Sequence, residues 1–70
     1  MRETQTVIVN GKEHPYVAGM TGASLLSDLP GVTGAVVVEV NGSIIPRERF
    51  DATSLHAGDR IEIVHFVGGG

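Results

Sequence analysis

The residues best suited to chemistry lie at the end of the sequence, where Gly68, Gly69 and Gly70 follow the apolar pair Phe66-Val67. They place an α-carboxylate on an arm that has no side chains. Because glycine lacks a Cβ and adopts backbone angles that other residues avoid, such an arm can enter a narrow enzyme channel. We therefore predict that residues 68–70 form a flexible tail that threads into a partner enzyme, with Gly70 as the reacting residue. The alternative is an inert, frayed terminus.

Other groups that could carry out chemistry are scattered along the chain. His14, His56 and His65 do not fall at the spacing of metal ligands, so we expect no metal site. His65 is expected on the helix side of the last strand, as a structural histidine with satisfied polar groups. The acidic residues form no evident pair for acid–base work. The chain has no cysteine, which excludes disulfides, thiolate metal sites and a cysteine nucleophile. We predict no catalytic residue.

Length and composition narrow the class of protein further. Seventy residues make one domain, too small for a two-domain enzyme with a buried cleft, so a separate catalyst must act on the tail. The net charge of −3 and the few aromatic residues argue against a nucleic-acid partner. No apolar run reaches membrane-spanning length, and residues 1–4 lack the apolar stretch of a signal peptide. We expect a soluble, cytoplasmic protein with no membrane partner.

Turn signals divide the sequence into short elements. An Asn-Gly pair occurs at 10–11 and again at 41–42, each beside a β-branched run, as in tight hairpins. Thr21 is a candidate cap for a short helix that Pro30 ends, because the residue before proline is steered out of the helical region. The elements predicted are strands 6–9, 12–17, 36–40, 43–45 and 60–67, a helix over 22–29, and a loop or single helical turn over 47–55. This order predicts an α+β fold of the β-grasp (ubiquitin-like) type, in which a mixed sheet over residues 1–67 packs on one short helix and the tail 68–70 follows.

Side-chain alternation separates the predicted strands into two faces. One face, with Leu25, Leu26 and Leu29 of the helix, should form the core: Val7, Val9, Val36, Val38, Val40, Ile61 and Ile63. The other face receives Ile8, Val37, Glu39, Glu62, Val64 and Phe66, and it is more apolar than a solvated sheet face usually is. We predict that its members Phe66, Val64, Ile8 and Val37 form a docking surface for a partner. The alternative is a face of β-prone residues without a partner, since isolated exposed apolar residues are ordinary.

Two segments of the second half, together with the Gly-Gly end, carry a resemblance to a known family. The first segment is Asn-Gly-Ser-Ile-Ile-Pro-Arg at 41–47 followed by Phe50, and the second is Leu-His-Ala-Gly-Asp-Arg-Ile-Glu-Ile at 55–63. In combination with Gly69-Gly70 they resemble the ThiS family of sulfur carriers in thiamine (thiazole) biosynthesis, within the ThiS/MoaD ubiquitin-like superfamily. The first half of the chain matches this family in the order of its elements more than in its motifs. Its Gly22-Ala23 pair is a weak start for a helix.

The resemblance implies a carrier rather than an enzyme. In that family the terminal glycine carboxylate is adenylated by an E1-like (ThiF-like) adenylyltransferase that uses ATP and Mg, while the carrier itself binds no cofactor. The acyl adenylate is converted to a thiocarboxylate with sulfur from a donor such as a cysteine desulfurase, and a ThiG-like thiazole synthase receives the sulfur. Carried over to this chain, the adenylation and thiocarboxylate site is Gly70, and Gly68 and Gly69 thread the channel.

Three other interpretations remain open from the sequence. A small subunit of molybdopterin synthase, similar to MoaD, shares the fold, the Gly-Gly end and the thiocarboxylate, although Pro46-Arg47 and the short chain favour the thiamine carrier. A ubiquitin-like modifier would join Gly70 to lysines of other proteins. A plain interaction module would leave the tail inert.

Overall fold

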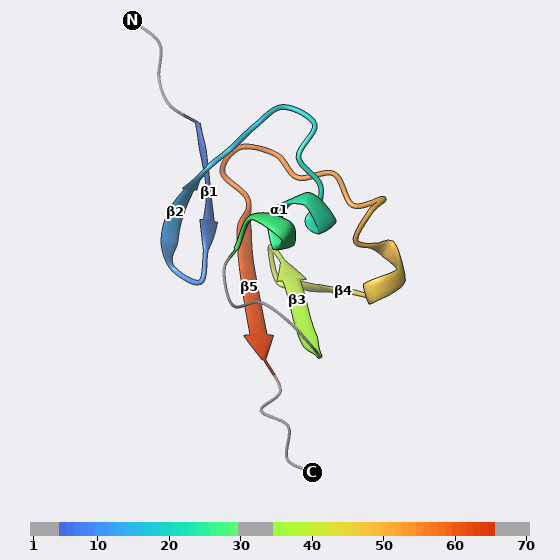
Figure 1. Ribbon diagram of the computed structural model, residues 1–70. Coiled ribbons are helices and arrows are strands. Elements are labelled where there is room, and N and C mark those ends of the chain that lie inside the picture. The colour runs from blue at the N-terminus through green and yellow to red at the C-terminus, as the bar shows by residue number, and fades with distance from the viewer. Residues whose placement is uncertain (1–4, 30–34, 66–70) are drawn as a thin grey trace, which may run out of the picture.

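The computed structural model describes residues 5–29 and 35–65. Within these ranges the elements are β1 Thr6–Val9, β2 Lys12–Pro15, α1 Gly22–Asp28, β3 Val36–Val40, β4 Ser43–Ile45, the 3-10 turn η1 Arg47–Arg49 and β5 Arg60–His65. The strands form one sheet in the order β2-β1-β5-β3-β4, and α1 lies across one face of it (Figure 1). The predicted α+β, β-grasp arrangement is confirmed.

The last strand occupies the centre of the sheet. β5 pairs parallel with β1, where Ile8 lies opposite Arg60, and antiparallel with β3, where Val37 lies opposite Val64. β1–β2 and β3–β4 are antiparallel hairpins. The strand that leads toward the predicted tail is therefore flanked by a hairpin on each side.

Both hairpins turn on an Asn-Gly pair, as predicted. Asn10 and Asn41 have φ angles of 49° and 51°, and the following Gly11 and Gly42 have 83° and 88°. Two consecutive positive φ angles define the two-residue turn whose twist matches that of antiparallel strands. Glycine takes the second position without strain, and asparagine tolerates the first.

The helix begins where the sequence predicted, and its weak first turn has a packing reason. Thr21 forms a capping box: its hydroxyl accepts from the Ser24 amide at 3.1 Å, and its own amide donates to the Ser24 hydroxyl at 2.9 Å. Gly22 is buried, and a Cβ there would lie 3.2 Å from the carbonyl oxygen of Phe50. The adjacent Ala23 amide donates to that same oxygen at 3.1 Å. Gly22 thus allows the backbone near η1 to approach the helix closely.

The helix ends one residue earlier than predicted. Asp28 is its last residue, and Leu29 has extended angles (φ −97°, ψ 121°). The position of Leu29 directly before a proline explains this, because proline excludes the preceding residue from the helical region.

The second strand is shorter than predicted. It ends at Pro15 rather than at Val17. The Tyr16 amide still donates to Gln5 at 2.9 Å, but Val17 is 63% exposed, and its carbonyl accepts from the Met20 amide at 2.9 Å. At Val17 the chain therefore already forms a turn and is no longer part of the strand.

The predicted core face is confirmed and is completed by residues from the loops. The buried apolar residues are Val7, Val9, Met20, Leu25, Val38, Phe50, Leu55, Ile61 and Ile63. Leu26, Leu29, Val36 and Val40 are partly buried against them. Met20, Phe50 and Leu55 were not predicted, because they belong to no regular strand or helix and show no periodicity.

His65 departs from the prediction. It alternates with Ile61 and Ile63 toward the helix side, but its side chain is exposed. The residue is the last of β5 and pairs with Val36, the first residue of β3, at the end of the sheet. The predicted placement on the helix side is thus confirmed, but the exposed side chain does not support the predicted structural role.

Candidate functional site

The predicted reactive residues lie outside the described ranges. Gly68, Gly69 and Gly70 follow the last described residue, His65, and so does the predicted docking residue Phe66. The described part of the site is therefore β5, which leads toward these residues, together with the sheet face around it.

The first hairpin holds β5 through the side chain of Asn10. Its Oδ1 accepts from the Ile63 amide at 2.7 Å, and its Nδ2 donates to the Ile63 carbonyl at 3.2 Å. β1 has ended at Val9, so the asparagine side chain supplies the backbone-like partner that the strand no longer provides. β5 is thus bonded beyond the end of its parallel neighbour.

The second hairpin holds the start of β5 in a similar way. The Oδ1 of Asn41 accepts from the Arg60 amide at 2.9 Å, and its Nδ2 donates to Asp59 Oδ1 at 3.0 Å. The other oxygen of Asp59 accepts from the His56 amide at 2.8 Å, which closes the turn before the strand. Both Asn-Gly turns therefore fix β5 in addition to reversing the chain.

The open face of the sheet, the one that α1 does not cover, brings together two of the predicted docking residues. Val37 and Val64 lie directly opposite each other on β3 and β5. Val64 is 52% exposed, and Val37 is half-buried. This pair lies near the end of β5.

Ile8 does not join that pair. It lies on the open face, but opposite Arg60 and Glu13. Arg60 and Val64 are four residues apart on β5, a distance of about 13 Å along a strand. The predicted docking residues therefore form a Val37–Val64 pair and a separate, half-buried Ile8.

Ile44 belongs to the open face and was missed. It lies opposite Glu39 on β4 and is 65% exposed. Its diagonal neighbour on β3 is Val37, within reach of apolar side chains. The two-residue hairpin places Ser43 opposite Val40, so the register could have assigned Ile44 to this face from the sequence.

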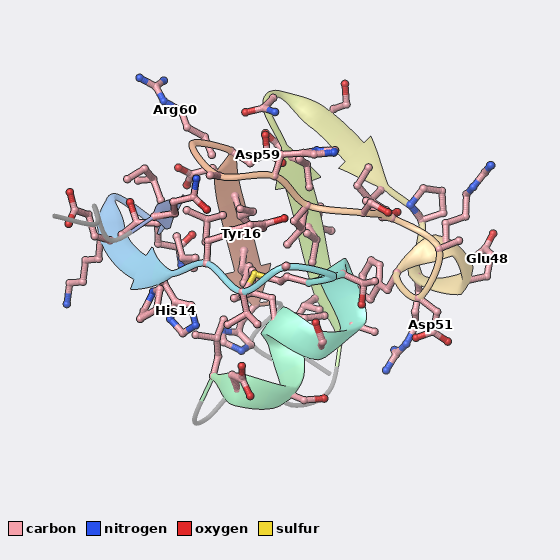
Figure 2. The ribbon with its side chains drawn as sticks, turned by 90° about the horizontal axis from the view of Figure 1, so that it is seen from above. His14, Tyr16, Glu48, Asp51, Asp59 and Arg60 are labelled. Atoms are coloured by element: carbon pink, nitrogen blue, oxygen red, sulfur yellow. The ribbon has the colours of Figure 1, made fainter. Side chains whose placement is uncertain are left out.

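A shallow pocket adjoins this apolar group. It has a volume of about 440 Å³, and its lining residues are Glu39, Asn41, Gly42, Arg60 and Glu62. Figure 2 shows Arg60 extending from the sheet on the side away from α1. Two carboxylates and one guanidinium give the pocket a net negative charge. In the part of the chain that the structure describes, no group of three potential metal ligands occurs and no helix has the length and apolarity to cross a bilayer.

Comparison with known proteins now extends these observations. The model of the ThiS family matches residues 7–70, nearly the whole chain. The chain belongs to the ThiS family. A crystal structure of a ThiS protein from Geobacter metallireducens is 40% identical, with a TM-score of 0.73 over 93% of this chain and 99% of that one. The sulfur carrier protein ThiS of Bacillus subtilis is 57% identical over 35 residues, which are 50% of this chain and 53% of that protein.

A larger protein also contains a segment of this kind. A thiazole synthase from Paramagnetospirillum magneticum is 38% identical over 64 residues, 91% of this chain but 20% of the synthase. The chain thus spans about a fifth of the length of that relative.

Membership of the ThiS family confirms the predicted class of the domain. It is a ThiS-family domain with a β-grasp fold.

Proposed function

We propose that this domain carries sulfur as a thiocarboxylate on Gly70 and delivers it for thiazole formation. The observation that carries the proposal is the ThiS family match, which runs through the glycine tail to residue 70. This match favours the thiamine carrier over a molybdopterin-synthase subunit, a protein modifier and an inert module.

The chemistry suits a carboxylate on an arm without side chains. A carboxylate oxygen of Gly70 attacks the α-phosphorus of ATP in the activating enzyme, with Mg as counterion, and pyrophosphate leaves. The acyl adenylate then has AMP as a good leaving group, which a sulfur nucleophile displaces. A donor that supplies hydrosulfide gives the thiocarboxylate directly. If the donor is a persulfide, a thiol reductant is needed to release the thiocarboxylate. This domain supplies Gly70 and recognition, and its partners supply the catalytic groups.

The structure supports delivery by an extended arm. β5 is held on both sides up to Ile63 by strand pairing and by Asn10. The five residues after His65 can span at most about 17 Å when extended. That reach suffices to carry a carboxylate from the sheet into the interior of a partner enzyme.

The proposed partners are a ThiF-like adenylyltransferase, a ThiG-like thiazole synthase and a sulfur donor such as a cysteine desulfurase. The synthase has support from the Paramagnetospirillum magneticum thiazole synthase, which contains a segment similar to this domain. Docking through Val37, Val64, Ile8 and Phe66 is part of the same proposal.

The decisive test is mass spectrometry of the C-terminal peptide. The first measurement establishes whether the native protein ends at Gly70. The chain is then incubated with the activating enzyme of the same genome, ATP, Mg and a sulfur donor. We expect one oxygen to be replaced by sulfur in the wild-type peptide and none in a chain that lacks Gly70, whose carboxylate is displaced by about 3.5 Å.

A second variant tests the threading of the arm. Gly69→Val adds a β-branched side chain that widens the arm and restricts its backbone, so it should also abolish sulfur incorporation. Thermal denaturation should show little change for either tail variant. Equal incorporation of sulfur without Gly70 would refute the assignment, and conjugates to lysine would indicate a modifier.

A further inference from the structure

Two glutamates face each other at the centre of the open face. Glu39 on β3 and Glu62 on β5 occupy directly opposite positions in the antiparallel pair. Like charges at such positions destabilise a sheet. In the described ranges, the ion pair within 4.0 Å joins His56 to Asp59, and it involves neither glutamate.

The surroundings of the glutamates suit a long cationic side chain. Both line the pocket of about 440 Å³, which Arg60 neutralises only in part. Val37 and Val64 form the next cross-strand pair, and Ile44 lies beside Glu39. An arginine or lysine combines an apolar stem with a charged head, so it could lie along these apolar residues and reach both carboxylates.

We propose that a thiazole synthase docks on this face and inserts one basic side chain between Glu39 and Glu62. The inference rests on the proposed function and deepens it by stating the chemistry of the partner surface. The incoming cation relieves the repulsion between the two carboxylates, and charge complementarity fixes the register of the complex. The apolar residues around the pocket exclude water from the ion pairs and thereby strengthen them.

One observation favours a thiazole synthase as the occupant, and a second places any enzyme that receives Gly70 near this face. The Paramagnetospirillum magneticum thiazole synthase contains a segment similar to this domain, so a domain of this kind occurs in the same chain as a synthase there. In addition, Val64 lies one residue before the end of β5. An enzyme that receives Gly70 must lie within about 17 Å of that end, because five residues cannot reach further.

The test is the affinity of the full chain for the thiazole synthase encoded in the same genome, measured by isothermal titration calorimetry. Glu39→Gln combined with Glu62→Gln removes the charges at nearly constant shape. We expect the double variant to bind at least about tenfold more weakly, with a smaller salt dependence. The free variant should be at least as resistant to heat as the wild type, since the repulsion is gone.

The matched control changes net charge by the same amount elsewhere. Glu48→Gln combined with Asp51→Asn alters two exposed acidic residues outside the pocket, and Figure 2 shows both far from Arg60. Its affinity should stay within about twofold of the wild type, because rim charges contribute little.

The outcomes separate this inference from the proposed function. Unchanged synthase binding by the Glu39/Glu62 variant overturns the inference, even if the wild-type chain forms its thiocarboxylate normally. Loss of binding to the activating enzyme, with synthase binding intact, also overturns it by assigning the pocket to another partner. If the wild type binds no synthase and gains no sulfur, the proposed function fails as well.

Discussion

At the scale of single residues, the two hairpin asparagines perform two tasks each. Asn10 and Asn41 adopt the positive φ that their turns need, and their amide groups bond to β5. Few residues combine both properties, because most side chains avoid positive φ and glycine has no amide to offer. The strand before the tail therefore depends on two residues that the sequence presents only as turn formers.

Asn10→Gly separates the turn conformation of this residue from its hydrogen bonds to β5. Glycine keeps the turn, but both hydrogen bonds to Ile63 are lost and the buried strand segment loses its partner. We expect the free energy of unfolding to fall by about 1–3 kcal/mol, measured by urea denaturation. Asn10→Asp, which keeps the turn and an acceptor but loses the donor, should fall between. A loss below a few tenths of a kcal/mol would show that water replaces the side chain at no cost.

At the scale of elements, the helix is fixed by contacts more than by its own propensity. α1 is only seven residues long and starts with glycine, so it would not be stable alone. Its capping box and the bond from Ala23 to Phe50 hold its first turn against the segment after η1. The glycine that weakens the start of the helix is thus needed for its close packing against Phe50.

Gly22→Ala tests this explanation. Alanine favours a helix by up to about 1 kcal/mol, but the added methyl meets a backbone oxygen at 3.2 Å that cannot rotate away. Overpacking costs of about 1–3 kcal/mol should prevail, so the free energy of unfolding should decrease. Ser27→Ala, at an exposed position of the same helix, should be neutral or slightly stabilising. A stabilised Gly22→Ala variant would show that the contact yields easily.

For the molecule as a whole, the two faces of the sheet differ in character. The face under α1 holds the core, and the open face presents apolar and acidic side chains around β5. Since β5 is central, the middle of the proposed docking face and the residues that lead to the tail belong to one strand. A partner that binds the face is thereby placed beside the residues that lead to Gly70.

Val64→Thr probes the apolar part of this face. Threonine is also β-branched and favours strands, and Val64 is half exposed, so the free energy of unfolding should change by less than about 1 kcal/mol. Binding to the thiazole synthase should weaken by about fivefold, the cost of losing roughly 1 kcal/mol of apolar burial. Val17→Thr, at an exposed position outside the sheet, is the control and should bind normally. Equal effects of the two variants would argue against docking at Val64.

Features that depend on residues close together in the chain could be predicted before the fold was known. The Asn-Gly turns, the Thr21 cap and the alternation of apolar residues follow from backbone angles and side-chain periodicity, and all were found as predicted. The family resemblance also came from the sequence, through short segments and the glycine end. The tail itself lies outside the described residues, and its threading role stays a prediction.

The contacts between distant segments became apparent only in the folded chain. The contact of Gly22 with Phe50 and the bonds from Asn10 to Ile63 join residues far apart in the chain. The opposition of Glu39 and Glu62 depends on β5 pairing with β3 in one register. Local patterns state which face a side chain takes but not which strand lies beside it, because strand order is set by the packing of the whole chain.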